Sequence, residues 1–249
     1  MAENAAYRWE LFDSEEYLEQ NYVPFLDVDR RILQIVRDFF SGHSFPSRTR
    51  GVDVGTGTNL YPALAMLPFC AGISLLEYAP TNRKWLSGQL DADPAGGVGF
   101  RGVWDKFWDV LTEQETYRKV ADPWERLCSR TEVREWDILH LATEEKWDVG
   151  TMFFVAESMT TIRDEFNAVL KNFCGLLRPG APFAVTFMEN SSGYDVGGQH
   201  FPGFAVGVRE IRKALKGLGK DLEFHSFDVG SEPLRDGYTG MILVHGFVK

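Results

Sequence analysis

The sequence predicts an α/β fold in which a doubly wound, mostly parallel seven-stranded sheet carries helices on both faces. A strand, a glycine turn and a helix follow one another between Arg50 and Met66. Apolar runs of strand length then alternate with segments of helical periodicity, which is the pattern of parallel strands joined by crossover helices. The last two runs have no connector long enough for a crossover helix, so we expect an antiparallel C-terminal hairpin.

The length of 249 residues suits a single domain with a sizeable core. Within 1–249 we expect an N-terminal helical lid over 1–45, a core over 46–249 and a helical excursion at about 91–130. The excursion contains aromatic residues at helical spacing, which is more typical of core packing than of a cofactor site. These residues are Trp104, Phe107 and Trp108, followed by Leu111.

The composition and net charge limit the classes of partner that we expect for this protein. The net charge of −10 argues against a nucleic-acid partner, because binding a phosphate backbone requires clustered Lys and Arg. No stretch resembles a signal peptide or a membrane span, so we expect no membrane partner and a cytoplasmic protein, either monomeric or weakly dimeric. The three cysteines are odd in number and far apart, which predicts buried free thiols and no metal site.

The turn Gly55-Thr56-Gly57-Thr58 follows the first predicted strand. Its glycines allow positive φ and close approach to a ligand, and the first amides of the following helix point toward the same place. The dinucleotide fingerprint is incomplete, because Leu60 stands where a small residue is required. A single nucleoside therefore fits better than a dinucleotide.

Glu77 ends the second predicted strand, where a carboxylate can accept hydrogen bonds from both ribose hydroxyls of a nucleoside. The alternative is an ordinary strand-to-helix turn beside a solvated carboxylate.

The remaining segments are a leader, helices and strands in alternation, and a polar, glycine-rich loop. We expect a loose leader over 1–11, helices at about 12–22, 27–40, 82–90, 161–177 and 208–218, strands at 135–138, 147–155, 183–188, 222–229 and 240–248, and the loop at 189–204.

Together these segments resemble a class I S-adenosylmethionine-dependent methyltransferase, which has a Rossmann-like fold. Three stretches are more specific: FDSEEYLEQNY near the N-terminus, EYAPTN after the second strand and SSGYDVGGQHF in the glycine-rich loop. They are similar to the nicotinamide, phenylethanolamine and indolethylamine N-methyltransferases. The resemblance covers nearly the whole chain and is weakest at 91–130.

The resemblance implies that S-adenosylmethionine is the cofactor, S-adenosylhomocysteine its product, and that no metal takes part. The carboxylate of S-adenosylmethionine can accept hydrogen bonds from backbone amides. Its ribose diol can donate to one acid, and its adenine amine can donate to a second acid. The implied cofactor-binding residues are Tyr17, Tyr22, Gly55, Thr56, Gly57, Thr58, Glu77, Tyr78, Asn82, Asp137 and Ile138.

The implied acceptor is a small molecule, most directly an aromatic or heterocyclic amine in a lidded pocket. An ammonium acceptor must lose a proton before methylation, so an acid near the pocket is expected to steer it and take that proton. Asp236 is the first candidate for this catalytic role, and Glu189 is the second. The expected substrate-binding residues are Tyr17, Phe154, Glu157, Tyr194, Asp195 and Asp236.

Two other functions stay open on the sequence alone. An NAD-dependent oxidoreductase shares the strand, turn and helix pattern but is disfavoured by Leu60. A non-catalytic relative that binds S-adenosylmethionine or another nucleoside would retain the turn and Glu77 without turnover. For each candidate acid, a solvated position in a loop is the structural alternative.

Overall fold

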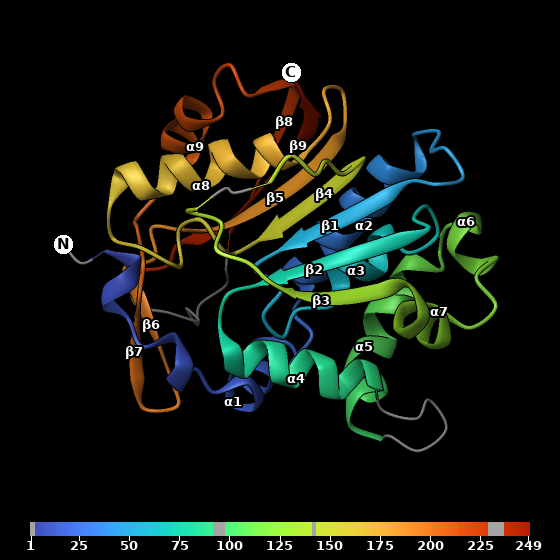
Figure 1. Ribbon diagram of the computed structural model, residues 1–249, viewed down its shortest axis with the longest axis horizontal. Helices are drawn as coiled ribbons and strands as arrows, with labels where there is room; N and C mark the ends of the chain where they lie inside the picture. The colour runs from blue at the N-terminus through green and yellow to red at the C-terminus, as the bar shows by residue number, and fades with distance from the viewer. Residues whose placement is uncertain (1–2, 92–97, 141–142, 229–236) are drawn as a thin grey trace.

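The computed structural model describes residues 3–91, 98–140, 143–228 and 237–249. Its main sheet has the order β3-β2-β1-β4-β5-β9-β8 (Figure 1). Strands β1 to β5 pair in parallel, and β9 pairs antiparallel with both β5 and β8. The bounds are β1 (Arg50–Val54), β2 (Gly72–Glu77), β3 (Thr131–Glu135), β4 (Val149–Phe153), β5 (Pro182–Glu189), β8 (Gly219–Asp228) and β9 (Gly240–Val248). The predicted doubly wound sheet with a terminal antiparallel hairpin is confirmed.

Helices cover both faces of the sheet (Figure 1). Side chains alternate across each strand, so that Val52 and Val54 of β1 pack on α8 and α9, whereas Ile73 and Leu75 of β2 pack with α2, α3 and α5. The bounds are α2 (Asp27–Ser41), α3 (Tyr61–Met66), α4 (Pro80–Asp91), α5 (Val98–Leu111), α6 (Glu115–Arg118), α7 (Pro123–Arg130), α8 (Arg163–Leu176) and α9 (Val208–Ala214). Within the described ranges, no helix is both long enough and apolar enough to span a membrane.

The third strand lies earlier than predicted. The sequence pointed to 135–138, but β3 covers Thr131–Glu135 and pairs with β2 from Ile73↔Thr131 to Glu77↔Glu135. The strand is at the edge of the sheet, and its residues are exposed or only half buried. An edge strand of this kind carries charged residues and lacks the apolar run by which buried strands are recognised.

The leader over 1–11 is ordered in its described part, which corrects the expectation of a loose segment. Short 3₁₀ turns, η1 (Asn4–Ala6) and η2 (Trp9–Leu11), precede α1 (Ser14–Asn21). The Asn4 side chain donates to the carbonyl oxygen of Met159 at 2.8 Å, and the Asn4 backbone N–H donates to Glu165 at 3.0 Å. These contacts hold the leader across the carboxyl ends of the strands.

The glycine-rich segment 189–204 contains a hairpin, where the sequence predicted only a loop. Strand β6 (Gly193–Val196) pairs antiparallel with β7 (Gln199–Pro202). The two residues between them are Gly197 and Gly198, with φ of +60° and +68°. Positive φ at both turn positions matches the twist of a two-residue hairpin and is accessible to glycine. The hairpin lies beside the N-terminal segment (Figure 1).

The aromatic stripe of α5 lies in the core, and its centre is Phe107. The Phe107 ring stacks on Tyr61 of α3 at 5.1 Å between centroids and meets the ring of Phe25 at 4.6 Å. We expect Phe107→Ala to lower the free energy of unfolding by about 3–5 kcal/mol, because it leaves a cavity where a fully buried ring packs. Lys106→Ala, one residue away on the exposed side of α5, should change it by less than about 0.5 kcal/mol. Urea unfolding of both variants checks this, and equal small effects would show that α5 is not part of the core.

Candidate functional site

A deep pocket opens at the carboxyl ends of the parallel strands, between β1 and β4. The strand order reverses at this point, and open α/β sheets bind ligands in the crevice that the reversal creates. Its empty volume, including the open mouth, is about 780 Å³. Residues from the glycine turn, the ends of β1, β2 and β4, the N-terminal segment and β6 form its wall.

The glycine turn forms the floor of the pocket. Gly55 has φ of +66° and lies so close to Val155 that an added Cβ would be 2.6 Å from its side chain. Gly57 also has positive φ, +54°. Only glycine adopts this backbone conformation without strain, and the resulting turn brings main-chain amides directly to the pocket surface. The close contact with Val155 therefore requires glycine at position 55, and the positive φ favours glycine at position 57.

Glu77 connects the turn to the end of β2. Its carboxylate accepts hydrogen bonds from the backbone N–H of Gly57 and of Ala79, each at 2.7 Å. Burial raises the pKa of Glu77, and the hydrogen bonds from Ala79 and Gly57 oppose that rise. The Asn82 side chain and the backbone of Tyr78 also donate to this carboxylate. Because Glu77 lies in the pocket wall, its carboxylate is placed to accept hydrogen bonds from a pair of vicinal hydroxyls as well.

Asp53 lies beneath the same turn, in the middle of β1. Its carboxyl oxygen accepts a hydrogen bond from the Thr151 hydroxyl at 2.6 Å. Burial raises the pKa of Asp53 to about 7, and the nearby charge of Glu77 adds to the rise. With a pKa of about 7, Asp53 is partly protonated at neutral pH, which reduces the negative charge buried beside Glu77.

Aromatic rings cover the pocket from two sides. Phe12, Tyr17 and Tyr22 come from the N-terminal segment, and Tyr194 comes from β6. The Tyr17 ring lies 6.0 Å from that of Tyr194 and 6.1 Å from that of Tyr22, measured between centroids. Aromatic faces attract cations and pack well on flat apolar ligands. The cover is thus suited to a ligand that is aromatic, cationic or both.

Polar contacts hold this cover in place. The hydroxyl of Ser14 donates to the side-chain oxygen of Asn82 at 2.8 Å, which ties α1 to α4. The backbone N–H of Gly197 donates to the Glu16 carboxylate at 3.1 Å, which ties the β6–β7 hairpin to α1. The N-terminal segment and the hairpin therefore form one continuous wall.

Phe154 reaches the pocket from the end of β4 through an unusual backbone conformation. Its φ is +60°, a backbone angle that residues with a Cβ rarely adopt, and its side chain is buried. Residues held in this region concentrate at ligand sites, where the surrounding structure compensates the strain. The neighbouring Phe153 also lines the pocket.

The donors of this pocket fit a nucleoside with an attached amino acid. Thr58 Oγ1 and Asn59 Nδ2 are buried at the wall and have no hydrogen-bond partner among the residues that the structure describes. Buried polar groups of this kind normally have a partner, which a bound ligand would supply. The turn amides and Thr58 suit a carboxylate, Glu77 suits a diol, and the apolar side chains of Trp136 and Ile138 suit a purine ring.

The structure gathers most of the residues expected at the cofactor and substrate sites around this pocket. Those in its wall are Tyr17, Tyr22, Gly55, Thr56, Gly57, Thr58, Glu77, Tyr78, Asn82, Ile138, Phe154 and Tyr194. Four expected residues, Asp137, Glu157, Glu189 and Asp195, are not part of the wall. Asp236 lies outside the described residues.

Asp137 caps the turn after β3. Its carboxylate accepts the backbone N–H of Leu139 at 2.9 Å and lies 2.7 Å from Nδ1 of His140. Trp136 and Ile138, on either side of Asp137, line the pocket. The contact of Asp137 with a purine amine stays a prediction.

The three other acids differ in their surroundings. Glu157 is fully buried behind the wall, where it accepts from the Met188 N–H at 2.9 Å and from the hydroxyl of Ser158, a wall residue, at 3.2 Å. Glu189 accepts from the Thr239 hydroxyl at 2.9 Å. Asp195 is exposed and pairs with His200 at 2.9 Å.

Sequence reasoning missed several wall residues. They are Asn4, Trp9, Phe12, Asn59, Trp136, Ser158 and Met159. Asn59 precedes Leu60 and α3, and its side-chain oxygen accepts a hydrogen bond from the backbone N–H of Tyr61 at 3.3 Å. The leader residues carried no local signal, because their position depends on long-range contacts with residues 159 and 165.

The fold and the site are those of the Rossmann-like S-adenosylmethionine-dependent methyltransferases. The N-methyltransferase NodS from Bradyrhizobium japonicum, solved with S-adenosyl-L-homocysteine, has this fold with a TM-score of 0.58 at 12% identity, over 96% of this chain and 94% of that one. The DhpI–SAH complex matches with a TM-score of 0.57 at 12% identity, over 93% and 89%. The NNMT/PNMT/TEMT family model matches residues 2–244, and the chain belongs to this family.

Curated relatives agree with the family. Indolethylamine N-methyltransferase from Oryctolagus cuniculus is 26% identical over 175 residues, which are 69% of this chain and 66% of the relative. The Mus musculus enzyme of the same name is 22% identical over 171 residues, 68% of this chain and 64% of the relative. The match thus spans slightly less than two thirds of those relatives. The family resemblance found in the sequence is confirmed.

The raised pKa of Asp53 predicts a pH dependence of stability. A carboxyl whose pKa is higher in the folded state binds more protons when folded, so its contribution to stability is lost as pH rises from about 4 to the folded pKa of about 7. Asp53→Asn, which keeps the oxygen that accepts from Thr151, should remove this loss. Between pH 5 and pH 8 the variant should gain about 2–3 kcal/mol relative to the unsubstituted protein.

Urea unfolding at several pH values measures this difference. Asp29, whose pKa burial also raises to about 7, titrates in both proteins and therefore cancels in the comparison. Parallel pH curves for the two proteins would show that Asp53 is ionised in the folded state.

Proposed function

We propose that this protein transfers a methyl group from S-adenosylmethionine to the nitrogen of a small aromatic or heterocyclic amine. The observation that carries the proposal is the pocket, in which a glycine turn and a buried carboxylate at the strand-order reversal are covered by aromatic rings. The N-methyltransferase names of the relatives support the same chemistry.

Different parts of the wall would hold different parts of the cofactor. The amides of the glycine turn, with Thr58, would hold its carboxylate, and Glu77 would accept from its ribose hydroxyls. Trp136 and Ile138 would pack on its adenine. When bound, S-adenosylmethionine supplies an electrophilic methyl group on a cationic sulfonium.

The chain's own contribution to methyl transfer is alignment and exclusion of water. In-line displacement at a sulfonium needs no protein nucleophile, so a rigid wall that holds the acceptor nitrogen in line with the methyl group accounts for most of the rate. Tyr17 and Tyr194 lie across the pocket mouth on separate segments that the Gly197–Glu16 hydrogen bond joins. Their aromatic faces also favour a cationic group beneath them.

The composition of the wall favours a flat, weakly polar acceptor. Phe12, Phe153 and Phe154 supply apolar surface, and an acid placed at the edge would select a basic nitrogen. Asp236 and Glu189 keep the catalytic role proposed for them, and Glu157 and Asp195 remain substrate-binding candidates. Glu157 accepts a hydrogen bond from Ser158, a wall residue, so it would position that hydroxyl.

Glu77→Gln tests the cofactor half of the proposal. The substitution keeps the size of the side chain but replaces one acceptor oxygen and removes the charge, so S-adenosylhomocysteine should bind roughly tenfold to a hundredfold more weakly. Glu125→Gln, on the exposed side of α7 and outside the pocket wall, should leave the affinity unchanged. Isothermal titration calorimetry measures both, and equal affinities for the two variants would contradict the assignment of Glu77.

A second experiment tests the acids through the choice of acceptor. An arylalkylamine is protonated at neutral pH and needs a base, whereas a pyridine nitrogen has a free lone pair. One of the two variants Asp236→Asn and Glu189→Gln is expected to remove the base. That variant should lower kcat/KM for an arylalkylamine by about a hundredfold and for a pyridine by less than about threefold. Raising the pH should restore activity with the arylalkylamine, because bulk solvent then deprotonates it.

Asp109→Asn, on the exposed side of α5, is the matched control. Equal losses of kcat/KM with both acceptors would show that the acids stabilise the structure and do not act as bases. Tight cofactor binding without turnover on any amine would instead favour a non-catalytic, nucleoside-binding protein.

A further inference from the structure

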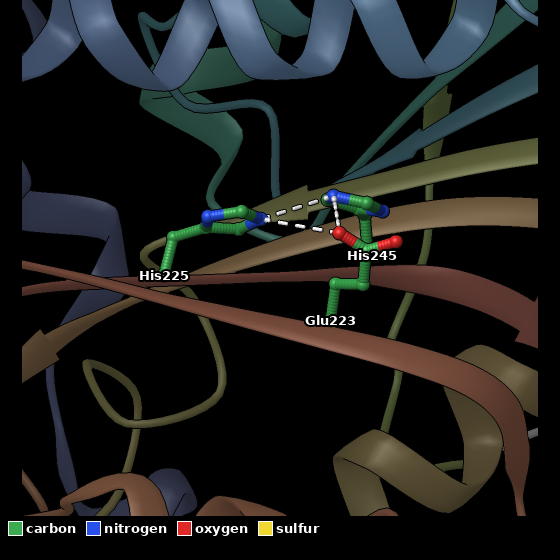
Figure 2. Close-up of side chains that lie close together, drawn as sticks. All are labelled: Glu223, His225 and His245. Carbon is green, nitrogen blue, oxygen red and sulfur yellow. Dashed lines mark hydrogen bonds and ion pairs between the residues drawn. The ribbon is translucent and has the colours of Figure 1, made fainter.

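Three side chains with metal-binding atoms converge on the C-terminal hairpin, away from the pocket. Among the described residues, Glu223, His225 and His245 form a group in which one ligand atom from each lies within 4.8 Å of the others (Figure 2). Glu223 and His225 are two residues apart on β8, so they lie on the same face of the sheet. Glu223 is directly opposite His245 of β9. The register of the hairpin thus fixes all three on one surface.

The distances approach those of a metal centre. The Nε2 atoms of His225 and His245 face each other at 3.1 Å. Glu223 Oε2 lies 4.0 Å from Nε2 of His225 and 3.8 Å from Nε2 of His245. In a tetrahedral zinc site with metal–ligand distances of about 2.0–2.1 Å, neighbouring donor atoms are about 3.3–3.4 Å apart. A small rotation of the Glu223 side chain, which is 68% exposed, closes the remaining gap.

The three ligand side chains differ in burial, which decreases from His245 to His225 to Glu223. The His245 side chain is 7% exposed, that of His225 is 30% exposed, and Glu223 is the most accessible. The ring of Phe39 in α2 lies 4.3 Å from the ring of His245 and fixes its orientation. The group therefore has a rigid inner ligand and an open outer side.

We propose that Glu223, His225 and His245 bind a divalent first-row transition metal, with Zn²⁺ the best fit, in an open site completed by water. Two imidazole nitrogens and one carboxylate suit Zn²⁺ and its neighbours, whereas Mg²⁺ and Ca²⁺ require mainly oxygen ligands. The ion would join the edge strand β8 to β9. None of the three residues lines the pocket, so the site does not depend on the proposed methyl transfer.

Metal titration of the tag-free full-length protein, after removal of metals with a chelator, tests the proposal. Zn²⁺ should bind at one ion per chain with a dissociation constant below about 100 µM, and the unfolding temperature should rise with its concentration. Co²⁺, bound in its place, should give the visible absorption of a four- or five-coordinate nitrogen and oxygen site. Glu223→Gln and His225→Ala should each weaken binding by about tenfold or more.

Both substituted residues lie on the edge strand and are more accessible than His245, so the variants are expected to fold, which circular dichroism checks. His200→Ala is the matched control, because it removes a histidine that pairs with an exposed acid on a different hairpin. Affinity unchanged in Glu223→Gln and His225→Ala, or lost equally in His200→Ala, would overturn the proposal. So would the absence of Zn²⁺ binding below about 1 mM.

Discussion

The carboxylate of Glu77 joins the two parts of the structure on which the site depends. It accepts from Gly57 in the glycine turn and from Ala79 at the start of the connection to α4, each at 2.7 Å. These hydrogen bonds fix the end of β2 against the end of β1, so the turn amides and the acid face the same space. Burying a carboxylate is costly unless it is hydrogen-bonded, and the raised pKa of Asp53 beneath it reduces the negative charge that is buried there near neutral pH.

Much of the fold follows from local sequence patterns. Buried parallel strands are apolar, and amphipathic helices repeat every three to four residues, so β1, β2, β5 and the terminal hairpin were recognisable. The edge strand β3 was misplaced because its side chains are partly exposed and charged. The β6–β7 hairpin was missed although Gly197-Gly198 is a recognised turn signal, because its short strands are as polar as a loop.

The site was predictable where it is built from the chain's own local geometry. Gly55, Gly57 and Glu77 were found because a turn and a strand end bring them together. The cover was found only in part: Tyr17, Tyr22 and Tyr194 through a family resemblance, whereas Asn4 and Trp9 were assigned to a loose leader. Asp137, expected at the adenine end of the cofactor, lies beside wall residues, and its carboxylate caps the following turn. Such choices depend on long-range packing, which a single sequence does not encode locally.

The proposed cofactor site would hold one nucleoside between the glycine turn, Glu77 and the aromatic cover. A crystal structure with S-adenosyl-L-homocysteine should then show both ribose hydroxyls within hydrogen-bond distance of the Glu77 carboxylate, and the amino-acid end of the ligand at Gly55 to Thr58. A ligand bound elsewhere, or one whose ribose does not contact Glu77, would contradict it.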